Sequence, residues 1–307
     1  MNQLEAMRIY LRVAEVASFT QTAEDLGLPK ASISSAIQRL ENLLGTRLLH
    51  RTTRRVQMTQ DGRVFYERCK DLLADFDEAQ GMFRAMPAEL RGRLRVDMPL
   101  IMARDVVVPN LPAFMQQHPQ IEIELSSTDR LVDPVREGFD CVVRVGTIGD
   151  SSLIARQLGH LRLINCASPA YLAKFGTPQG PADLPRHRLI HYVPRLGGKC
   201  PGFEYVDTKA GNELRFIAME GALTVNNSEA YQAACLSGLG LIQAPETSLR
   251  PLIEQGRLVE ILPEHLARPM PVALLYANRR HVPQRVQAFM RWLAECLHPQ
   301  LLAATND

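Results

Sequence analysis

An unbroken helical pattern divides this chain into two parts. Residues 61–86 contain no proline, and their glycines stand near the two ends, at Gly62 and Gly81. Apolar side chains recur at alternating gaps of four and three residues, at Phe65, Cys69, Leu72, Phe76, Ala79, Phe83 and Met86. This heptad pattern predicts one long helix with a narrow apolar edge that suits pairing with a second copy of the chain. The alternative is that this edge packs on the chain's own C-terminal part.

Composition limits the class of protein without identifying it. A chain of 307 residues with 46% hydrophobic residues is long enough to bury more than one core. No apolar run reaches membrane-spanning length, and the N-terminus lacks the basic and then apolar pattern of a secretory signal, so we expect a cytoplasmic protein without a membrane partner. The net charge of only +2 is a poor argument for nucleic-acid binding over the whole chain, so local patterns must decide.

The six cysteines have no regular spacing. A disulfide framework or a zinc cluster is therefore not expected, and buried thiols are the simpler interpretation, with a redox switch as the alternative. His187 and His191 are separated by three residues, but they lie in a sequence that alternates like a strand, so a half-exposed strand end is preferred to a metal site. We expect no metal and no cofactor.

Before the heptad segment, residues 4–13 predict a first helix, and residues 18–41 predict two short helices folded across Gly27, the earlier of them at about residues 20–26. Apolar positions of the third helix form one stripe, to which Ala23 and Leu26 add from the second helix: Ile33, Ala36, Ile37, Leu40 and Leu44. The opposite face carries small or hydrogen-bonding side chains: Ala31, Ser34, Ser35, Gln38, Arg39 and Asn42. Such a face can enter the major groove of DNA, whereas the alternative is a helical hairpin with a solvated face.

Two short strand-like runs follow, at residues 47–50 and 56–59. The turn between them holds guanidinium and hydroxyl groups: Arg51, Thr52, Thr53, Arg54 and Arg55. This pattern predicts a wing that contacts the sugar-phosphate backbone, positioning the protein without reading sequence.

At this point the chain resembles a known family. The run from Ala14 to Leu49, with its continuation to Gly62, resembles the winged helix-turn-helix of LysR-type transcriptional regulators in these residues: Ala23, Leu26, Ser34, Ile37, Leu40, Glu41, Leu44, Gly45, Leu48, Arg51 and Thr59. Further motifs lie where that family has its effector-domain signatures, at 92–96, 135–140, 144–146 and 167–172. Two positions depart from the family pattern: Pro29 replaces a polar helix cap, and Ser35 replaces a long polar or basic side chain. Base preference therefore cannot be transferred from a relative.

The resemblance implies a ligand-responsive regulator rather than an enzyme. It implies an α/β fold with a winged helix-turn-helix domain at 1–60, a dimerisation linker helix and hinge at 61–90, and an effector-binding domain at 91–307. That last domain would resemble periplasmic binding proteins, with lobe I at 91–163 and 268–299 and lobe II at 164–267. The implied partners are double-stranded promoter DNA with inverted repeats, a second copy in a homodimer, a homotetramer, RNA polymerase and a small-molecule effector.

Strand candidates support the α/β interpretation of the C-terminal part. They lie at 94–98, 121–125, 141–145, 161–166, 189–192, 222–225, 239–243 and 272–276. Glu122 and Glu124 share one face of the second of these strands and are expected to be solvated. Ligands of open α/β sheets bind at the carboxyl ends of strands, so a cleft between the lobes is expected there.

We select two sets of candidate site residues. The DNA-binding set is Lys30, Ala31, Ser32, Ser34, Ser35, Gln38, Arg39, Arg51, Thr52, Thr53, Arg54 and Arg55. The effector-binding set is Pro99, Leu100, Ile101, Ser127, Thr128, Arg144, Gly146, Ala167, Ser168, Asn226, Asn227 and Ser228. Helix amides and hydroxyls near Ser168 and Ser228, with Arg144, favour a carboxylate. The family usually has a small polar residue near the first strand end, so the apolar run 99–101 also departs from its pattern and favours an aromatic or hydrophobic effector. The alternative is structural: the serines and asparagines cap helices, and Arg144 pairs with Asp140 or Asp150.

Two other classes of protein remain as alternatives. An α/β enzyme is disfavoured because the sequence has no dinucleotide-binding Gly-x-Gly-x-x-Gly after a strand, no phosphate-binding loop and no Gly-x-Ser-x-Gly elbow. We therefore name no catalytic residue. A ligand-binding module without a DNA role is disfavoured because the arginines of the wing and Ser34 are present.

Overall fold

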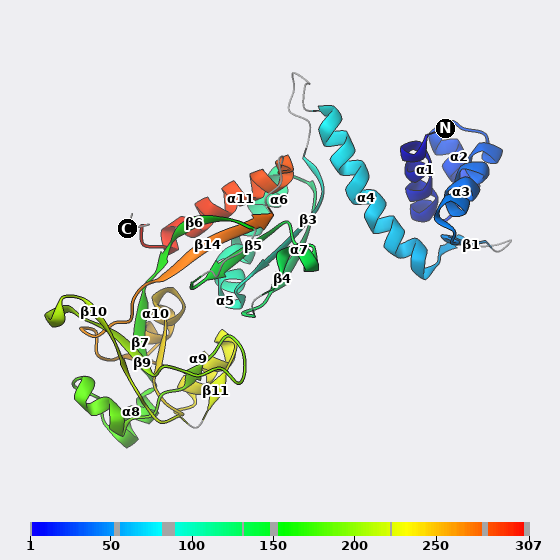
Figure 1. Cartoon of the computed structure of the whole chain (residues 1–307). Coiled ribbons are helices and arrows are strands. Elements are labelled where there is room, and N and C mark those ends of the chain that lie inside the picture. Colours follow the sequence, from blue (N-terminus) through cyan, green and yellow to red (C-terminus); the bar gives the residue numbers. More distant parts are fainter. Residues whose placement is uncertain are drawn as a thin grey trace. The chain divides into compact units, whose positions relative to one another are not determined.

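The computed structural model describes residues 2–51, 56–81, 90–130, 132–147, 153–221, 223–277 and 282–303. Its contacts divide the chain into two units (Figure 1). Unit 1 contains Met1–Arg93, His118–Glu122 and Pro283–Arg285, and unit 2 contains the remaining residues. The predicted combination of a helix-turn-helix, a long helix and an α/β region is confirmed.

Unit 1 begins with three helices and a two-stranded ribbon. Its elements are α1 (Gln3–Val16), α2 (Phe19–Leu26), α3 (Lys30–Leu44), β1 (Leu49–Arg51), β2 (Val56–Met58) and α4 (Gln60–Gly81). The Asn2 side chain caps α1 by accepting from the Glu5 amide at 2.8 Å, and the Ser18 side chain caps α2. Gly27 ends α2 in the left-handed conformation, as expected from the sequence.

The core of unit 1 uses the predicted stripe, shortened at its end. Ile33, Ala36, Ile37 and Leu40 of α3 are 0–2% exposed and pack with α1. The expectation that Leu26 and Leu44 join this core is wrong, since they are 41% and 40% exposed. Each is the last residue of its helix, where the chain turns away from the packed face.

The heptad edge of α4 is packed in its first part and more exposed further along. Phe65 and Cys69 pack into the core of unit 1, while Leu72 is 52% exposed. Phe83 and Met86 lie outside the described residues. At the start of α4, a Cβ on Gly62 would lie 2.1 Å from the Leu48 carbonyl oxygen, so only glycine fits this close approach.

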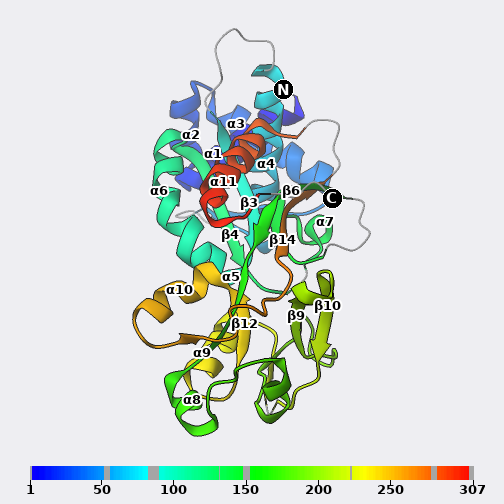
Figure 2. The ribbon, with the colours of Figure 1, turned by 90° about the vertical axis from the view of Figure 1, so that its left-hand side faces the viewer.

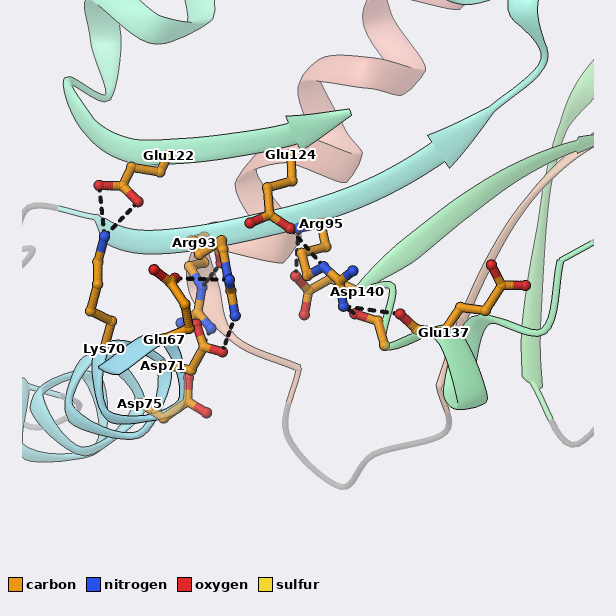
Figure 3. A network of polar contacts seen from close by, with 12 residues as sticks. Glu67, Lys70, Asp71, Asp75, Arg93, Arg95, Glu122, Glu124, Glu137 and Asp140 are labelled. Carbon is orange, nitrogen blue, oxygen red and sulfur yellow. Dashed lines mark hydrogen bonds and ion pairs between the residues drawn. The ribbon is translucent and has the colours of Figure 1, made fainter. Parts of the chain in front are cut away.

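Charged residues join α4 to other segments of unit 1 (Figure 3). The Arg93 guanidinium lies between Glu67 and Asp71, at 3.0 and 2.7 Å. Lys70 donates to both carboxylate oxygens of Glu122, at 2.7 and 2.9 Å. Glu122 and Glu124 are exposed, as expected of a solvated face, and each is paired with a basic side chain that lies far away in the sequence.

In unit 2, Arg95 donates to Glu124 at 2.8 Å and to the carbonyl oxygens of Glu137 and Gly138, while its amide donates to Asp140 (Figure 3). This second cluster explains why Glu124 is also paired.

Lobe I, which lies mostly in unit 2, is built on a five-stranded sheet in the order β4-β3-β5-β14-β6. Its strands are β3 (Arg91–Met98), β4 (Gln120–Ser127), β5 (Cys141–Val145), β6 (Leu153–Leu161) and β14 (Met270–Ala277). Its helices are α5 (Leu100–Met102), the π-turn Ala103–Val107, α6 (Val108–Gln117), α7 (Pro134–Glu137) and α11 (Gln284–Leu297). Phe114 of α6 contacts the rings of Phe289 and Trp292, which hold α11 beside it.

Lobe II is built on a smaller antiparallel sheet in the order β12-β7-β13. Its elements are β7 (Leu163–Ala167), α8 (Pro169–Phe175), β8 (His191–Tyr192), β9 (Phe203–Asp207), β10 (Glu213–Ile217), β11 (Thr224–Val225), α9 (Ser228–Leu236), β12 (Ile242–Pro245), α10 (Glu246–Glu254) and β13 (Val259–Glu260). Its strand β12 lies beside helices α9 and α10 (Figure 2). The chain enters this lobe between β6 and β7 and leaves it between β13 and β14.

Two strand predictions need correction, and one hairpin was missed. The single strand expected at 161–166 is the end of β6 followed by β7, with Arg162 between them. The strand expected at 239–243 begins only at Ile242. The β9–β10 hairpin was not expected: β9 does alternate, with Phe203 and Tyr205 buried, but β10 has no buried residue.

Candidate functional site

The α3 helix presents a polar face with no acidic group in its first two turns. Its buried stripe fixes the helix against α1, which turns the opposite side chains to solvent. The candidate residues on that face are exposed or half-buried: Lys30, Ala31, Ser32, Ser34, Ser35, Gln38 and Arg39. All seven therefore lie on one accessible side of the helix.

Two carboxylates near α3 have hydrogen-bond partners. Glu41 accepts hydrogen bonds from the amides of Leu48 and Leu49, at 2.9 and 3.2 Å, which turns its charge towards the start of the ribbon. Asp25 of α2 accepts from Gln21 and Arg12, and these contacts, that of Gln21 first, lower the pKa of its carboxyl. The candidate residues on the exposed face of α3 include Lys30 and Arg39 and no acidic side chain.

Lys30 and Arg39 have no ion-pair partner among the residues that the structure describes. The helix also begins without a side-chain cap, because Pro29 occupies the N-cap position and its side chain accepts nothing. The positive end of the helix dipole therefore adds to the charge of Lys30 at this end.

The ribbon after α3 has the position expected of a wing. β1 pairs antiparallel with β2, with Leu49 opposite Met58. The Thr59 hydroxyl donates to the Arg47 carbonyl at 2.7 Å and accepts from the Gly62 amide, so it fixes the ribbon to α4. The candidate residues Thr52, Thr53, Arg54 and Arg55 lie outside the described residues, as does the side chain of Arg51.

The second candidate site is the lobe junction, which we define as the ends of β3, β4 and β5 together with the start of α9. Asp97 of β3, which is fully buried, pairs with Arg144 of β5 at 2.9 Å. Asp97 also accepts from the Thr128 hydroxyl at 3.2 Å. Arg144 therefore pairs with Asp97 on the neighbouring parallel strand and not with the expected Asp140, while the other expected partner, Asp150, lies outside the described residues.

Asp129 was missed in the sequence and is central to the junction. Its Oδ1 accepts from the Leu100 amide at 3.1 Å, and its Oδ2 accepts from the amide and the hydroxyl of Ser228, both at 2.6 Å. The sequence did contain a signal, because an acidic residue directly follows Thr128 at a strand end. It was passed over because its two partners lie far away along the chain.

The remaining effector candidates are distributed unevenly. Pro99, Leu100, Ile101, Ser127 and Thr128 are half-buried at the junction, and the Ser127 hydroxyl oxygen is buried with no hydrogen-bond partner among the described residues. Asn227 caps α9 beside Asn226. Gly146 donates its amide to the Pro271 carbonyl.

Two other candidates have structural surroundings. Ala167 and Ser168 are buried at the end of β7, where Ser168 caps α8.

The expected carboxylate receptor is thus already occupied by the protein itself. Arg144 holds Asp97, and the amide and hydroxyl of Ser228 hold Asp129. The expectation that these donors await an effector carboxylate requires correction.

Cysteine and metal chemistry find little support in the described part of the chain. Burial raises the pKa of Cys69, Cys166 and Cys235 to about 12, so these side chains are neutral thiols at ordinary pH. Within the described ranges no three His, Cys, Asp or Glu side chains are grouped to hold a metal ion. No helix among those residues is long and apolar enough to cross a membrane.

Two models of known families match parts of the chain. Residues 4–63 match the model of the bacterial regulatory helix-turn-helix protein, lysR family. Residues 87–297 match the LysR substrate binding domain.

Curated relatives extend over nearly the whole chain. An uncharacterized HTH-type transcriptional regulator of Escherichia coli, YhjC, is 45% identical over 96% of this chain and 97% of its own length. An HTH-type transcriptional repressor of Pseudomonas aeruginosa is 36% identical over 96% of this chain and 92% of its own length.

Solved structures agree. CrgA of Neisseria meningitidis, a LysR-type transcriptional regulator, has a TM-score of 0.59 at 28% identity, covering 95% of this chain and 97% of its own. The full-length virulence activator AphB of Vibrio cholerae has a TM-score of 0.57 at 30% identity, covering 96% of this chain and 99% of its own.

Proposed function

Because the chain belongs to the LysR family of ligand-responsive, DNA-binding transcriptional regulators, we propose that the exposed face of α3 reads the major groove of promoter DNA. The observation that carries this proposal is a helix face with free polar donors and with its neighbouring carboxylates turned away. The proposed DNA-contacting residues of α3 are Lys30, Ala31, Ser32, Ser34, Ser35, Gln38 and Arg39.

The side chains divide into reading and positioning groups. We propose that Gln38 pairs with adenine, since an amide matches its two hydrogen-bonding groups, and that Ala31 contacts a thymine methyl group. From their sequence alone, Arg51, Arg54 and Arg55, with Thr52 and Thr53, are proposed to hold phosphates.

The proposed assembly is a homodimer formed through the linker helix, and two dimers form a homotetramer. Exposed apolar side chains on α4 support this, since Val64 is 64% and Leu72 is 52% exposed. A twofold pair of α3 helices would read an inverted repeat. We place the protein in the cytoplasm, where its DNA is found, with RNA polymerase as a further partner at the promoter.

The proposed domain boundaries remain those of the sequence: 1–60 for DNA binding, 61–90 for the linker, and 91–307 for the effector-binding domain with its two lobes.

For the effector we propose a small hydrophobic or aromatic molecule at the lobe junction. Pro99, Leu100 and Ile101 would supply apolar contacts, and the buried Ser127 hydroxyl would supply a polar one. An effector carboxylate would have to displace Asp97 from Arg144 or Asp129 from Ser228, so only the hydrophobic part of the sequence-based prediction is retained.

Gel retardation with the promoter region upstream of the protein's own gene tests the DNA-binding proposal. Gln38→Ala should weaken binding to the cognate site about tenfold and leave unrelated DNA unaffected, because one bidentate base contact contributes about 1–3 kcal/mol. Arg54→Ala should instead weaken binding to every DNA and reduce the slope of log K against log[salt] by about 0.9.

Arg136→Ala is the matched control for Arg54→Ala, since it also removes one arginine charge, from an exposed position of α7 in unit 2. Equal losses for Gln38→Ala on cognate and unrelated DNA would contradict its role in base reading. No retardation of the wild type at low salt would overturn the proposal.

A further inference from the structure

One carboxylate connects the two lobes of unit 2. Asp129 follows β4 of the five-stranded sheet, and Ser228 begins α9, whose buried side chains pack against the core of lobe II. The Asp129 carboxylate accepts three hydrogen bonds, one from the Leu100 amide in lobe I and two from Ser228 in lobe II. Removing this side chain would therefore leave donors of both lobes without their acceptor.

Other charges at the lobe junction also have internal partners. Arg104, from the turn after α5, pairs with Asp105 at 2.6 Å and reaches Glu229 of α9 in the other lobe. The groups joined in these contacts, among the described residues, are four carboxylates and two guanidiniums: Asp97, Asp105, Asp129, Glu229, Arg104 and Arg144. The balance at the junction is therefore acidic, and an arriving anion would be repelled.

The charge of Asp129 also acts on lobe II. The pKa of Tyr192, on β8, is raised to about 12, first by burial and then by the negative charge of Asp129. A second anion at this place would face the same carboxylate that disfavours ionisation of the phenol.

We propose that Asp129 takes the place of a ligand carboxylate at the lobe junction, so that the effector makes its contacts there as an uncharged or cationic molecule. This inference rests on the proposed function, because it assumes that the effector binds between the lobes. It reverses the charge class that the sequence favoured. The hydrogen bonds that a carboxylate ligand would make to the Ser228 amide and hydroxyl are made by the chain itself.

Thermal unfolding of the full chain tests the proposal with acetate and benzoate as probes, against chloride at equal ionic strength. Asp129→Ala should have a lower Tm than the wild type, and acetate or benzoate should raise that Tm by about 2–4 °C above the value in chloride. The wild type should show no such rise. The added carboxylate fills the place of the missing side chain and reforms its hydrogen bonds.

Two further variants show whether the anion acts at this place. Asp133→Ala is the matched control, because Asp133 accepts from the amides of Val135 and Arg136 entirely within lobe I. Asp129→Asn retains an oxygen and fills the same volume, so acetate should not raise its Tm. If Asp129→Ala does not fold alone, its refolding yield in acetate against chloride gives the readout.

The proposal is overturned if benzoate stabilises the wild type as much as Asp129→Ala, if acetate leaves Asp129→Ala unchanged, or if Asp133→Ala or Asp129→Asn responds equally. Equal refolding yields in acetate and chloride would overturn it as well. Gel retardation with the same preparations reports separately on the proposed DNA binding. If the wild type retards DNA but acetate does not raise the Tm of Asp129→Ala, the inference about Asp129 is rejected and the DNA-binding proposal is not affected.

Discussion

The face of α3 and the lobe junction are both rich in polar groups, but the two regions differ in whether these groups have partners within the chain. On α3, Lys30 and Arg39 have no ion-pair partner among the described residues, and the neighbouring Glu41 is turned inward. At the lobe junction, Arg144 and Ser228 each hold a carboxylate of the chain itself. The same donor groups therefore indicate an external partner in one place and internal structure in the other.

The difference shows how polar groups divide between binding and stability. Removing a solvated donor changes the free energy of unfolding little, whereas leaving a buried donor without its acceptor costs the full desolvation free energy of that donor. Substitutions on α3 should therefore change affinity for DNA, and substitutions at the lobe junction should change the free energy of unfolding.

The largest expected effect comes from Asp97→Ala, which leaves the Arg144 guanidinium buried and uncompensated. Asp97 is 0% and Arg144 is 7% exposed, so water cannot replace the lost carboxylate. We expect the free energy of unfolding to fall by about 3–5 kcal/mol. Urea denaturation followed by circular dichroism measures this.

The control is Asp133→Ala, which removes an exposed carboxylate that caps α7. It should cost about 1 kcal/mol. The double variant Asp97→Leu/Arg144→Met should recover much of the stability that Asp97→Ala loses. An equal cost for Asp97→Ala and Asp133→Ala would remove the distinction between the two regions.

A smaller effect is expected at Glu41, the one residue of α3 that behaves like those of the junction. Its carboxylate accepts from the amides of Leu48 and Leu49, whose side chains are buried. Glu41→Ala should lower the free energy of unfolding by about 2 kcal/mol, because both amides lose an acceptor.

Thermal unfolding of the neighbouring variant Asn42→Ala, an exposed position, should show a change within about 0.5 kcal/mol. If Glu41→Ala lowered the free energy of unfolding as little as Asn42→Ala does, the Glu41 carboxylate would belong to the solvated face. The contrast with the lobe junction would then apply to every residue of α3.

The sequence predicted α3 well because its evidence is local. The spacing of Ile33, Ile37 and Leu40 defines the buried face within one helix, and Gly27 marks the turn before it. The same reasoning failed at the helix ends, at Leu26 and Leu44. Periodicity says which side of a helix is apolar, but not how far the packing partner extends.

The lobe junction was predicted only in part because its contacts are distant in sequence. A strand end led to Thr128 and a helix start led to Ser228, and both side chains donate to carboxylates of the junction. Asp129 and Ser228 are 99 positions apart, and Asp97 and Arg144 are 47 positions apart. No local pattern assigns such pairs, so the charge balance of the junction had to come from the structure.

The smallest expected effect is on the pH dependence of stability at His187 of lobe II, which tests whether a buried polar group there also contributes to stability. Its imidazole is 6% exposed and lies 3.3 Å from the Tyr171 hydroxyl. Burial lowers the pKa of His187 below its usual 6.5, and the charge of Asp183 opposes this shift. The unfolded chain therefore binds the proton more readily, so this stability is complete above about pH 6.5 and is lost as the pH falls towards the lower folded pKa. His187→Gln should reduce the fall in Tm between about pH 7 and pH 5, whereas the exposed His50→Gln should not. An identical fall in all three proteins would show that His187 does not share the behaviour of a buried group with an internal partner.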